Sequence, residues 1–380
     1  MKKKYIILSI ITLVLLITFV TSFNYFKTTN TYVENNSNNQ TKITKGISMN
    51  LEQTAGAGDY KQVTQSSWPT EGYKFNAELS RCEKGSELSW DDTKKAVIVS
   101  GNLSDKCYVY FDIYQPTLAE YIKSQYTGTQ GDNALYYHNS TLTNGAGDNS
   151  YRYAGASDSV NNYICLGSDA TTCPDANLFR IIGVFGDQTK VIRAKSVGNK
   201  QWHTSSSNTW SSSSLNTYLN GEYLTGLGTL ADKIATTTWK VGGGLMPNIA
   251  ISVPKKAYQY EVGSSSSTTT VNKKIGLMYV TDYYYSASPS AWTLVGYNES
   301  DATKDYRAAT STNWLYLGST EWTISRSSDN ANNAFYVNRT GRVSYSIVAS
   351  YFGVHPSFNL ESSVKYVSGS GSMSDPVRVN

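Results

Sequence analysis

An uncharged apolar run near the start of the chain constrains its folding more than any other feature. The run, Tyr5–Phe23, holds no charge, no Pro and no Gly, and it follows Lys2, Lys3 and Lys4. At 1.5 Å per residue, a helix over it would be roughly 28 Å long, close to the hydrocarbon thickness of a bilayer. Residues 1–27 are therefore predicted to be a signal-anchor, a transmembrane helix that crosses the cell membrane once. The lysines would stay inside and the C-terminal bulk would be extracellular.

A cleaved signal peptide is the alternative interpretation of the same run. Signal peptides usually have a shorter apolar region, about 7–15 residues, followed by small residues at the cleavage site. Val20–Ser22 is the candidate for such a site, and it matches the pattern poorly. In both interpretations the chain after about residue 27 is exported, and in the first the membrane is a partner.

Three further parts are predicted after the run. Residues 28–45 are polar and rich in Asn and Thr, so they cannot bury a core and are predicted to be a spacer. Residues 46–115 hold short alternating segments separated by turn residues, which predicts a small β-sandwich-like module. Residues 116–380 mix short strands, a few helices and long loops. The predicted fold class is α+β.

Four cysteines, one pair in each predicted domain, indicate disulfides. None forms a C-x-x-C pair, and the three histidines are too few and scattered to complete a zinc site. An even number of cysteines in an exported protein favours pairing. The expected bonds are Cys82–Cys107 and Cys165–Cys173, each closing a short loop and adding about 2–4 kcal/mol. The alternative is four reduced, buried thiols.

The charge balance gives no basis for nucleic-acid binding. The chain has 33 basic and 29 acidic residues, and without Lys2–Lys4 the balance is 30 to 29. No basic stripe is visible, so no nucleic-acid partner is expected.

Local patterns predict several elements of the second domain. Residues 117–126 favour a helix after Pro116, and residues 215–224 favour a helix broken at Gly221. Residues 274–281 are predicted to be one buried strand. Turn residues between apolar segments predict hairpins at 178–185 with 190–194, at 334–338 with 342–345, and at 364–367 with 377–379.

The stretch from Trp314 to Leu360 carries motifs of a known superfold. It has W-x-x-S at Trp322, a Tyr-Val hairpin with a turn at Gly341, and the sequence Gly353-Val354-His355-Pro356 before a strand. On these residues it resembles bacterial surface domains related to the formylglycine-generating enzyme and C-type-lectin-like superfold. The resemblance covers about residues 117–380 and implies a C-type-lectin-like domain. Its fold-signature positions are Trp322, Gly341, Gly353 and Pro356.

Departures from those families limit what the resemblance implies. No cysteine follows Cys173, so the cysteine pair and copper of the enzyme are not expected. The E-P-N, Q-P-D and W-N-D motifs of calcium-dependent sugar binding do not occur. His355 stands where these families often have Arg. No metal, no cofactor and no catalytic residue is expected.

Aromatic residues are the best candidates for a ligand site. Tyr283, Tyr284, Tyr285 and Trp292 lie in a loop-rich part of the second domain, and exposed Tyr and Trp are favoured at binding surfaces. The alternative is that they fill a β-rich core. The expected function is non-enzymatic: a surface protein that binds a glycan or protein ligand, or mediates adhesion. Alternatives are an extracellular enzyme of unrecognised type and a structural, pilus-like subunit.

Overall fold

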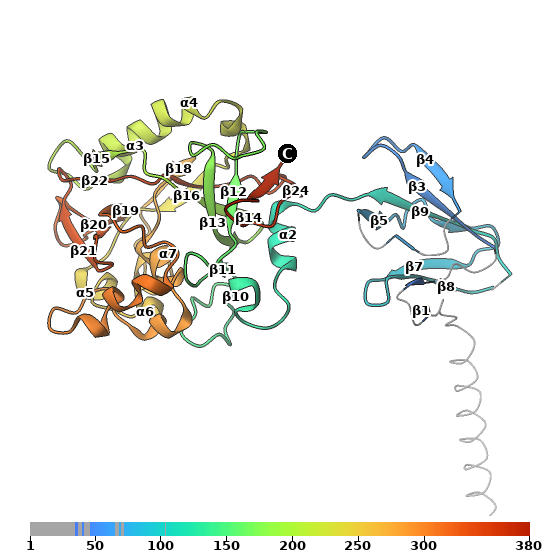
Figure 1. Ribbon diagram of the computed structural model, residues 1–380, viewed down its shortest axis with the longest axis horizontal. Helices are drawn as coiled ribbons and strands as arrows, with labels where there is room; N and C mark the ends of the chain where they lie inside the picture. The colour runs from blue at the N-terminus through green and yellow to red at the C-terminus, as the bar shows by residue number, and fades with distance from the viewer. Residues whose placement is uncertain (1–34, 37–39, 42–45, 65–67, 70–71, 103) are drawn as a thin grey trace, which may run out of the picture. The chain divides into compact units, whose positions relative to one another are not determined.

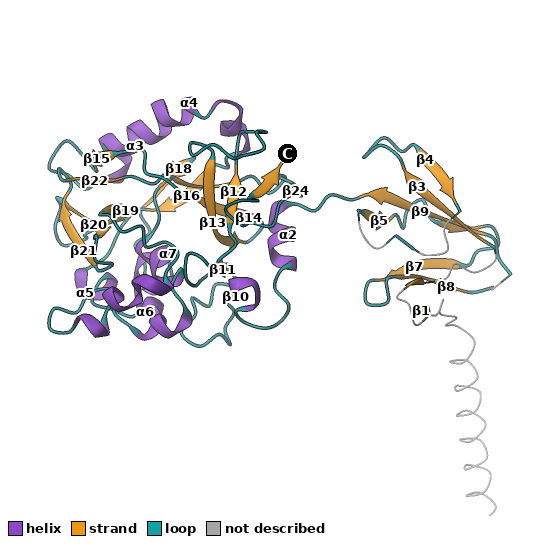
Figure 2. Cartoon of the chain, in the orientation of Figure 1, coloured by secondary structure: helices purple, strands orange, loops and turns teal. Residues whose placement is uncertain are grey.

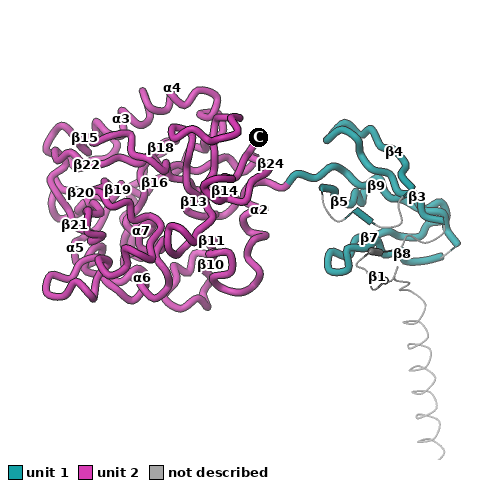
Figure 3. The backbone as a smooth tube through the Cα atoms, viewed as in Figure 1, with its two compact units in different colours: residues 1–115 teal, residues 116–380 magenta. Residues whose placement is uncertain are grey.

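The computed structural model describes most of the chain after residue 45, together with two short pieces before it. The described residues are 35–36, 40–41, 46–64, 68–69, 72–102 and 104–380. The chain divides into two compact units, Met1–Gln115 and Pro116–Asn380, which are coloured separately in Figure 3. Each unit has a hydrophobic core of its own.

Two sheets in the described part of the first unit share one core. Its strands are β3 (Ile47–Glu52), β4 (Tyr60–Val63), β5 (Tyr73–Phe75), β6 (Arg81–Cys82), β7 (Glu87–Asp91), β8 (Ala96–Ser100) and β9 (Cys107–Ile113), after a short pair β1 (Asn35–Asn36) and β2 (Gln40–Thr41). The larger sheet has the order β4-β3-β9-β5, with β6 beside β9, and β7 pairs with β8. Met49 of β3, Phe111 of β9 and Val97 of β8 meet in the core, so the two sheets pack on each other.

A nine-stranded mixed sheet is the largest sheet of the second unit, and several of its strands are labelled in Figure 1. Its strands are β10 (Leu135–Tyr137), β11 (Tyr151–Tyr153), β12 (Tyr163–Cys165), β13 (Leu178–Phe185), β14 (Gln188–Arg193), β18 (Ile275–Gly276), β23 (Ser357–Asn359), β24 (Tyr366–Ser368) and β25 (Val377–Val379). The main order is β18-β23-β14-β13-β12-β25-β24. Strand β13 is buried along almost its whole length, as expected for a central strand that reads LFRIIGVF. Strand β25 runs parallel to β12, which joins distant parts of the chain.

A five-stranded sheet and a separate hairpin complete the β-structure of this unit. The sheet has the order β15-β22-β19-β20-β21, and β16 pairs with β17. The bounds are β15 (Asn199–Gln201), β16 (Thr237–Lys240), β17 (Thr270–Lys273), β19 (Glu321–Arg326), β20 (Asn333–Val337), β21 (Val343–Ile347) and β22 (Tyr351–Gly353).

The helices of the second unit are short and lie around the sheets (Figure 2). They are α2 (Leu118–Ser124), α3 (Ser214–Tyr218), the π-helical turn η3 (Leu219–Tyr223), α4 (Leu224–Gly226), α5 (Met246–Ile249), α6 (Pro254–Glu261) and α7 (Val280–Tyr285). Six 3-10 segments are η1 (Asp132–Ala134), η2 (Trp210–Ser212), η4 (Gly228–Lys233), η5 (Pro289–Thr293), η6 (Ala302–Lys304) and η7 (Tyr306–Thr312). Helix α2 begins with a capping box, because the Thr117 hydroxyl accepts from the Glu120 N–H and Glu120 accepts from the Thr117 N–H.

The predicted fold class, with its transmembrane helix and single-pass membrane location, is corrected by the structure. Both units are sheet-rich, with mixed sheets and few helices. Across the described residues, no helix is long and apolar enough to cross a membrane. The run Tyr5–Phe23, on which the anchor was predicted, lies outside the described residues. The frequent Gly, Ser, Thr and Asn residues keep helices short, because their side chains compete with the helical backbone or leave it too free.

Several local predictions are confirmed and two are wrong. Helix α2 and the hairpins β13–β14, β20–β21 and β24–β25 form at the predicted places. Residues 274–281 give only the two-residue strand β18 before α7 begins, because the Asp282 carboxylate accepts the Tyr279 N–H at 2.8 Å and starts a helix. Gly221 does not break its helix, since it lies inside the π-helical turn η3.

Candidate functional site

The four aromatic residues predicted as ligand contacts lie in the core, so that prediction is wrong. Every residue of α7 is buried, and Tyr283, Tyr284, Tyr285 and Trp292 are each at most 1% exposed. Their polar atoms have partners inside the protein: Tyr283 Oη donates to Gly341 O at 2.8 Å, and Tyr284 Oη donates to Ile249 O at 2.9 Å. These side chains therefore stabilise the fold.

The fold-signature residues all have structural roles. Trp322 on β19 is buried and donates from Nε1 to Lys200 O at 3.0 Å. Gly341 has φ +90°, and a Cβ there would meet Tyr306 O at 3.0 Å. A Cβ on Gly353 would overlap the carboxylate of Glu321, 2.1 Å from Oε2. The carbonyl of the buried Pro356 accepts the Arg193 N–H at 2.9 Å.

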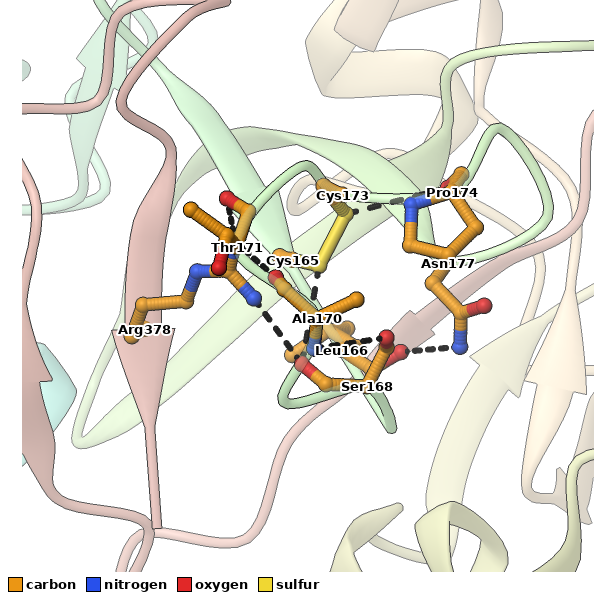
Figure 4. Close-up of a disulfide and its surroundings, with 9 residues drawn as sticks. All are labelled: Cys165, Leu166, Ser168, Ala170, Thr171, Cys173, Pro174, Asn177 and Arg378. Atoms are coloured by element: carbon orange, nitrogen blue, oxygen red, sulfur yellow. Dashed lines mark hydrogen bonds between the residues drawn. A yellow bond between two sulfur atoms is a disulfide. The ribbon is translucent and has the colours of Figure 1, made fainter.

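Both predicted disulfides are present. Cys82 and Cys107 are cross-strand partners on β6 and β9, and Cys165 bonds to Cys173 in the second unit. Figure 4 shows the latter with the loop that it closes and with the Arg378 side chain beside it. The Arg378 guanidinium donates to the carbonyls of Ser168, Ala170 and Thr171 at 2.8–3.1 Å.

A wide cleft of about 730 Å³ lies along this disulfide loop. Arg378 and Lys233 line it together with Asp169, Asp375 and backbone from the loop. The best-placed cation of the cleft is Arg378. Its guanidinium already donates to the three carbonyls, so this arginine holds the loop in place. The cleft therefore offers little free charge to a ligand.

A buried ion pair joins the main sheet to α7. Lys190 on β14 is 5% exposed and Asp282 on α7 is 3% exposed. The Lys190 Nζ lies 2.5 Å from Asp282 Oδ2, which also accepts the Tyr279 N–H. Aromatic rings surround the ammonium, whose Nζ is 4.5 Å from the centre of the Tyr279 ring and 5.3 Å from that of Trp239. Two buried charges in hydrogen-bond contact form the centre of the candidate site.

Arg152 on β11 is a second buried cation in the same place. Its Nη2 donates to Asp148 Oδ2 at 2.6 Å, and its Nη1 lies 3.8 Å from Asp282 Oδ1. The guanidinium also stacks over the Phe185 ring, with 4.6 Å between their centres. Asp282 thus lies between two cations, and Arg152 lies between two carboxylates.

The environment shifts the pKa values of these groups. Burial lowers the pKa of Lys190, although Asp282 acts in the opposite direction. Burial works against the charge of Arg152 too, but Asp148 and Asp282 outweigh it and raise its pKa. Burial opposes ionisation of Asp148, yet Arg152 and the hydrogen bonds from Ser150 hold its pKa well below the usual range. The shifts of Arg152 and Asp148 are those of a buried ion pair, and the lowered pKa of Lys190 makes the cluster a candidate functional site.

A buried carboxyl supports the site from behind. Glu261, the last residue of α6, accepts the N–H groups of Val280 and Thr281 at 2.9 and 2.8 Å. Burial raises its pKa, and the hydrogen bonds from Ser325 and Thr281 act against that shift. Glu261 holds the start of α7 and so positions Asp282.

The ion network forms the base of a pocket of about 230 Å³, called here the Lys190 pocket. Its lining combines aromatic and apolar side chains with polar and charged ones from several elements. The lining residues are Asp148, Arg152, Phe185, Lys190, Thr237, Thr238, Trp239, Lys240, Tyr258, Val262, Tyr279, Thr281, Asp282 and Asn359.

None of the charged residues of the Lys190 pocket was identified from the sequence. One signal was present: Lys190 stands in the apolar strand sequence KVIRA, where a charge at an inward position needs a partner. Nothing in the sequence pairs it with Asp282, which is 92 residues away along the chain. In the described part of the chain, no group of three or more His, Cys, Asp or Glu could hold a metal ion.

The fold and pocket define a sheet-rich unit with a small site built around buried charges. Residues 186–362 match a family described as Domain of unknown function (DUF6273). The match contains Lys190, Asp282 and Asn359 but starts after Arg152 and Phe185, so the pocket extends beyond it. No match was found among curated proteins or among solved structures. The resemblance to C-type-lectin-like domains stays a prediction.

Proposed function

We propose that the second unit is a ligand-binding module that holds one small polar molecule in the Lys190 pocket. One observation carries the proposal: two cations and two carboxylates, nearly all buried, converge at the base of a pocket with aromatic walls. Pockets that combine apolar walls with a few convergent polar groups and shifted pKa values are the usual places for small ligands.

The setting of the module is an oxidising compartment. Two disulfides and no free cysteine account for all four cysteines of the chain. Disulfides persist outside the reducing cytoplasm, which supports such a setting for the module.

The arrangement of the charged groups fits ligand binding better than it fits catalysis. Lys190, Asp282, Arg152 and Asp148 already pair with one another, and this pairing keeps each side chain in one orientation. Groups held in this way present a rigid pattern to a ligand at a small cost in conformational entropy.

Catalysis by Lys190 is a second candidate, favoured by one observation. Burial lowers the pKa of Lys190, and a desolvated lysine is a nucleophile toward carbonyl compounds. Reduction with borohydride in the presence of small aldehydes would trap a Schiff base as a mass increase on Lys190. Trapping at Lys190 alone would favour this candidate, and equal labelling of all lysines would exclude it.

A screen of small polar molecules by ligand-observed NMR tests the binding function. The full chain and its Lys190→Met variant are compared, with Lys195→Met as the matched control, because Lys195 forms an exposed ion pair with Asp175. We expect at least one compound that binds the full chain and the control but not the pocket variant. A screen whose every binder is unaffected by Lys190→Met would contradict the proposal.

A further inference from the structure

We propose that the ligand of the Lys190 pocket is a small hydroxylated carboxylate, with the size and chemistry of a single acidic sugar. The inference rests on the proposed function and deepens it. It follows from the hydrogen bonds that remain unmade at the base and on one side of the pocket.

The base of the pocket has spare donors on Lys190. The ammonium carries three N–H groups. Among the described residues its Nζ donates to Asp282 alone. Because Lys190 is 5% exposed, bulk water reaches it poorly. Buried donors without partners are costly, so the remaining N–H groups favour an acceptor inside the pocket, beside the Tyr279 and Trp239 rings that the ammonium also faces.

Arg152 adds further donors to the same side. Its Nε donates to Ser150 Oγ at 2.8 Å, and its Nη2 donates to Asp148. Its Nη1 makes no hydrogen bond to a described residue, since its carboxylate neighbour, Asp282 Oδ1, is 3.8 Å away. The planar guanidinium and the ammonium together suit the two oxygens of a carboxylate.

A hydrogen-bond acceptor, the side-chain oxygen of Asn359, lies on another side of the pocket. Asn359 on β23 is the cross-strand partner of Lys190, so both side chains lie on the same face of the sheet. Its Nδ2 donates to Thr237 Oγ1 at 3.1 Å, whereas its buried Oδ1 has no partner among the described residues. A ligand hydroxyl would donate to this oxygen.

The charge of the lining also favours an acid. Arg152, Lys190 and Lys240 line the pocket against Asp148 and Asp282, which leaves one positive charge in excess. Lys240 donates to Gly263 O and Ser266 Oγ, which leaves it one N–H group, whereas Lys190 retains two. Aromatic walls such as Tyr258 and Tyr279 suit the apolar face of a sugar ring. A volume of about 230 Å³ is below that of typical drug-sized sites and limits the ligand to one small unit.

A matched pair of sugars tests the inference. Methyl β-glucuronide and methyl β-glucoside differ only at C6, which is a carboxylate in the first and a hydroxymethyl group in the second. Their binding to the full chain is measured by calorimetry at low and moderate salt. We expect the glucuronide to bind at least about tenfold more tightly, the effect of one charge-assisted hydrogen bond.

Three variants locate the binding. Lys190→Met should reduce glucuronide affinity by about tenfold or more. Asn359→Ala, which leaves the ion network in place, should weaken the glucuronide and the glucoside equally. Lys274→Met is the matched control, because the Lys274 ammonium is partly buried and donates to Ala231 O outside the pocket.

Each outcome decides the inference. Preference for the glucuronide that disappears in Lys190→Met and persists in Lys274→Met supports it. Equal affinity for both sugars contradicts the proposal that the ligand carries a carboxylate. If both sugars bind in the pocket, the proposed function still holds. No binding of either sugar overturns the inference as well, and the broader screen then decides the proposed function separately.

Discussion

The ammonium nitrogen of Lys190 lies 2.5 Å from a carboxylate oxygen of Asp282, and this contact joins the central sheet to α7. Both side chains are at most 6% exposed. The pair therefore has two roles, since it stabilises the position of α7 and forms the base of the pocket.

Removing the charge of Asp282 should destabilise the second unit. In Asp282→Asn the buried Lys190 loses its carboxylate, and such a broken buried pair costs about 3–5 kcal/mol. Urea unfolding followed by intrinsic fluorescence measures the loss. Asp175→Asn breaks the exposed pair with Lys195 and should change stability by less than about 1 kcal/mol. Equal effects of the two substitutions would contradict a structural role for the buried pair.

The stability of the second unit should fall between about pH 7 and pH 5 because of His138. Burial and the nearby Arg152 hold the pKa of His138 well below its usual value, so the folded state keeps the ring neutral. The unfolded chain binds a proton below about pH 6.5, and the contribution is therefore present above that pH and lost as the pH falls.

The variant His138→Gln isolates this effect. Its side-chain oxygen can still accept the Ala146 N–H, which donates to His138 Nδ1 at 3.1 Å, but it does not titrate. Its unfolding free energy should be lower than that of the unmodified chain at about pH 7 and should depend less on pH in this window. An unchanged slope would show that another group is responsible.

Loss of the Cys165–Cys173 disulfide should weaken the second unit alone. The bond closes a loop with a sequence separation of 8, for which about 2–3 kcal/mol is expected. Calorimetry of the Cys165→Ser/Cys173→Ser variant should show a lower unfolding temperature for the larger unit. The matched variant Cys82→Ser/Cys107→Ser should instead affect the first unit. A shift of the same transition by both variants would contradict this assignment.

Tyr284 should matter for stability and not for ligand binding. Tyr284→Phe removes the hydrogen bond to Ile249 O and should cost about 0.5–1.5 kcal/mol, whereas Tyr284→Ala should cost about 3–5 kcal/mol. Ligand affinity of the Tyr284→Phe variant should equal that of the unmodified chain. A loss of ligand binding without a loss of stability would instead show that Tyr284 contributes to the ligand site.

The segment that matches the family, residues 186–362, should not fold alone. It lacks β13, which pairs with β14 on one side and with β11 and β12 on the other. It also lacks Arg152, so Asp282 would lose one of its two cations. Circular dichroism and NMR of this fragment should show a disordered chain, with residues 116–380 as the folded comparison.

Local sequence patterns predicted local structure well in this chain. Hairpin β13–β14 follows from two apolar runs around Gly186, and helix α2 follows from the apolar spacing after Pro116. These features depend on residues a few positions apart, and the same is true of the disulfide loop from Cys165 to Cys173.

The candidate site could not be predicted in the same way, because it depends on distant residues. Arg152, Lys190 and Asp282 come from two strands and a helix, and the pairing of these elements decides which charges meet. The exposed or buried state of Tyr283–Tyr285 was equally undetermined, since aromatic residues suit both a core and a binding surface. Their burial follows from α7 being enclosed on all sides.

The parallel pairing of β25 with β12 determines when, during synthesis of the chain, the sheet of the larger unit can be completed. Arg378 on β25 reaches Ser168 beside β12, 210 residues earlier. During synthesis the smaller unit can close its sheet as soon as β9 has emerged, whereas the larger one must wait for its last strand with β12 uncovered. Nascent chains of this protein are therefore expected to leave one edge of β12 unpaired until β25 has been synthesised.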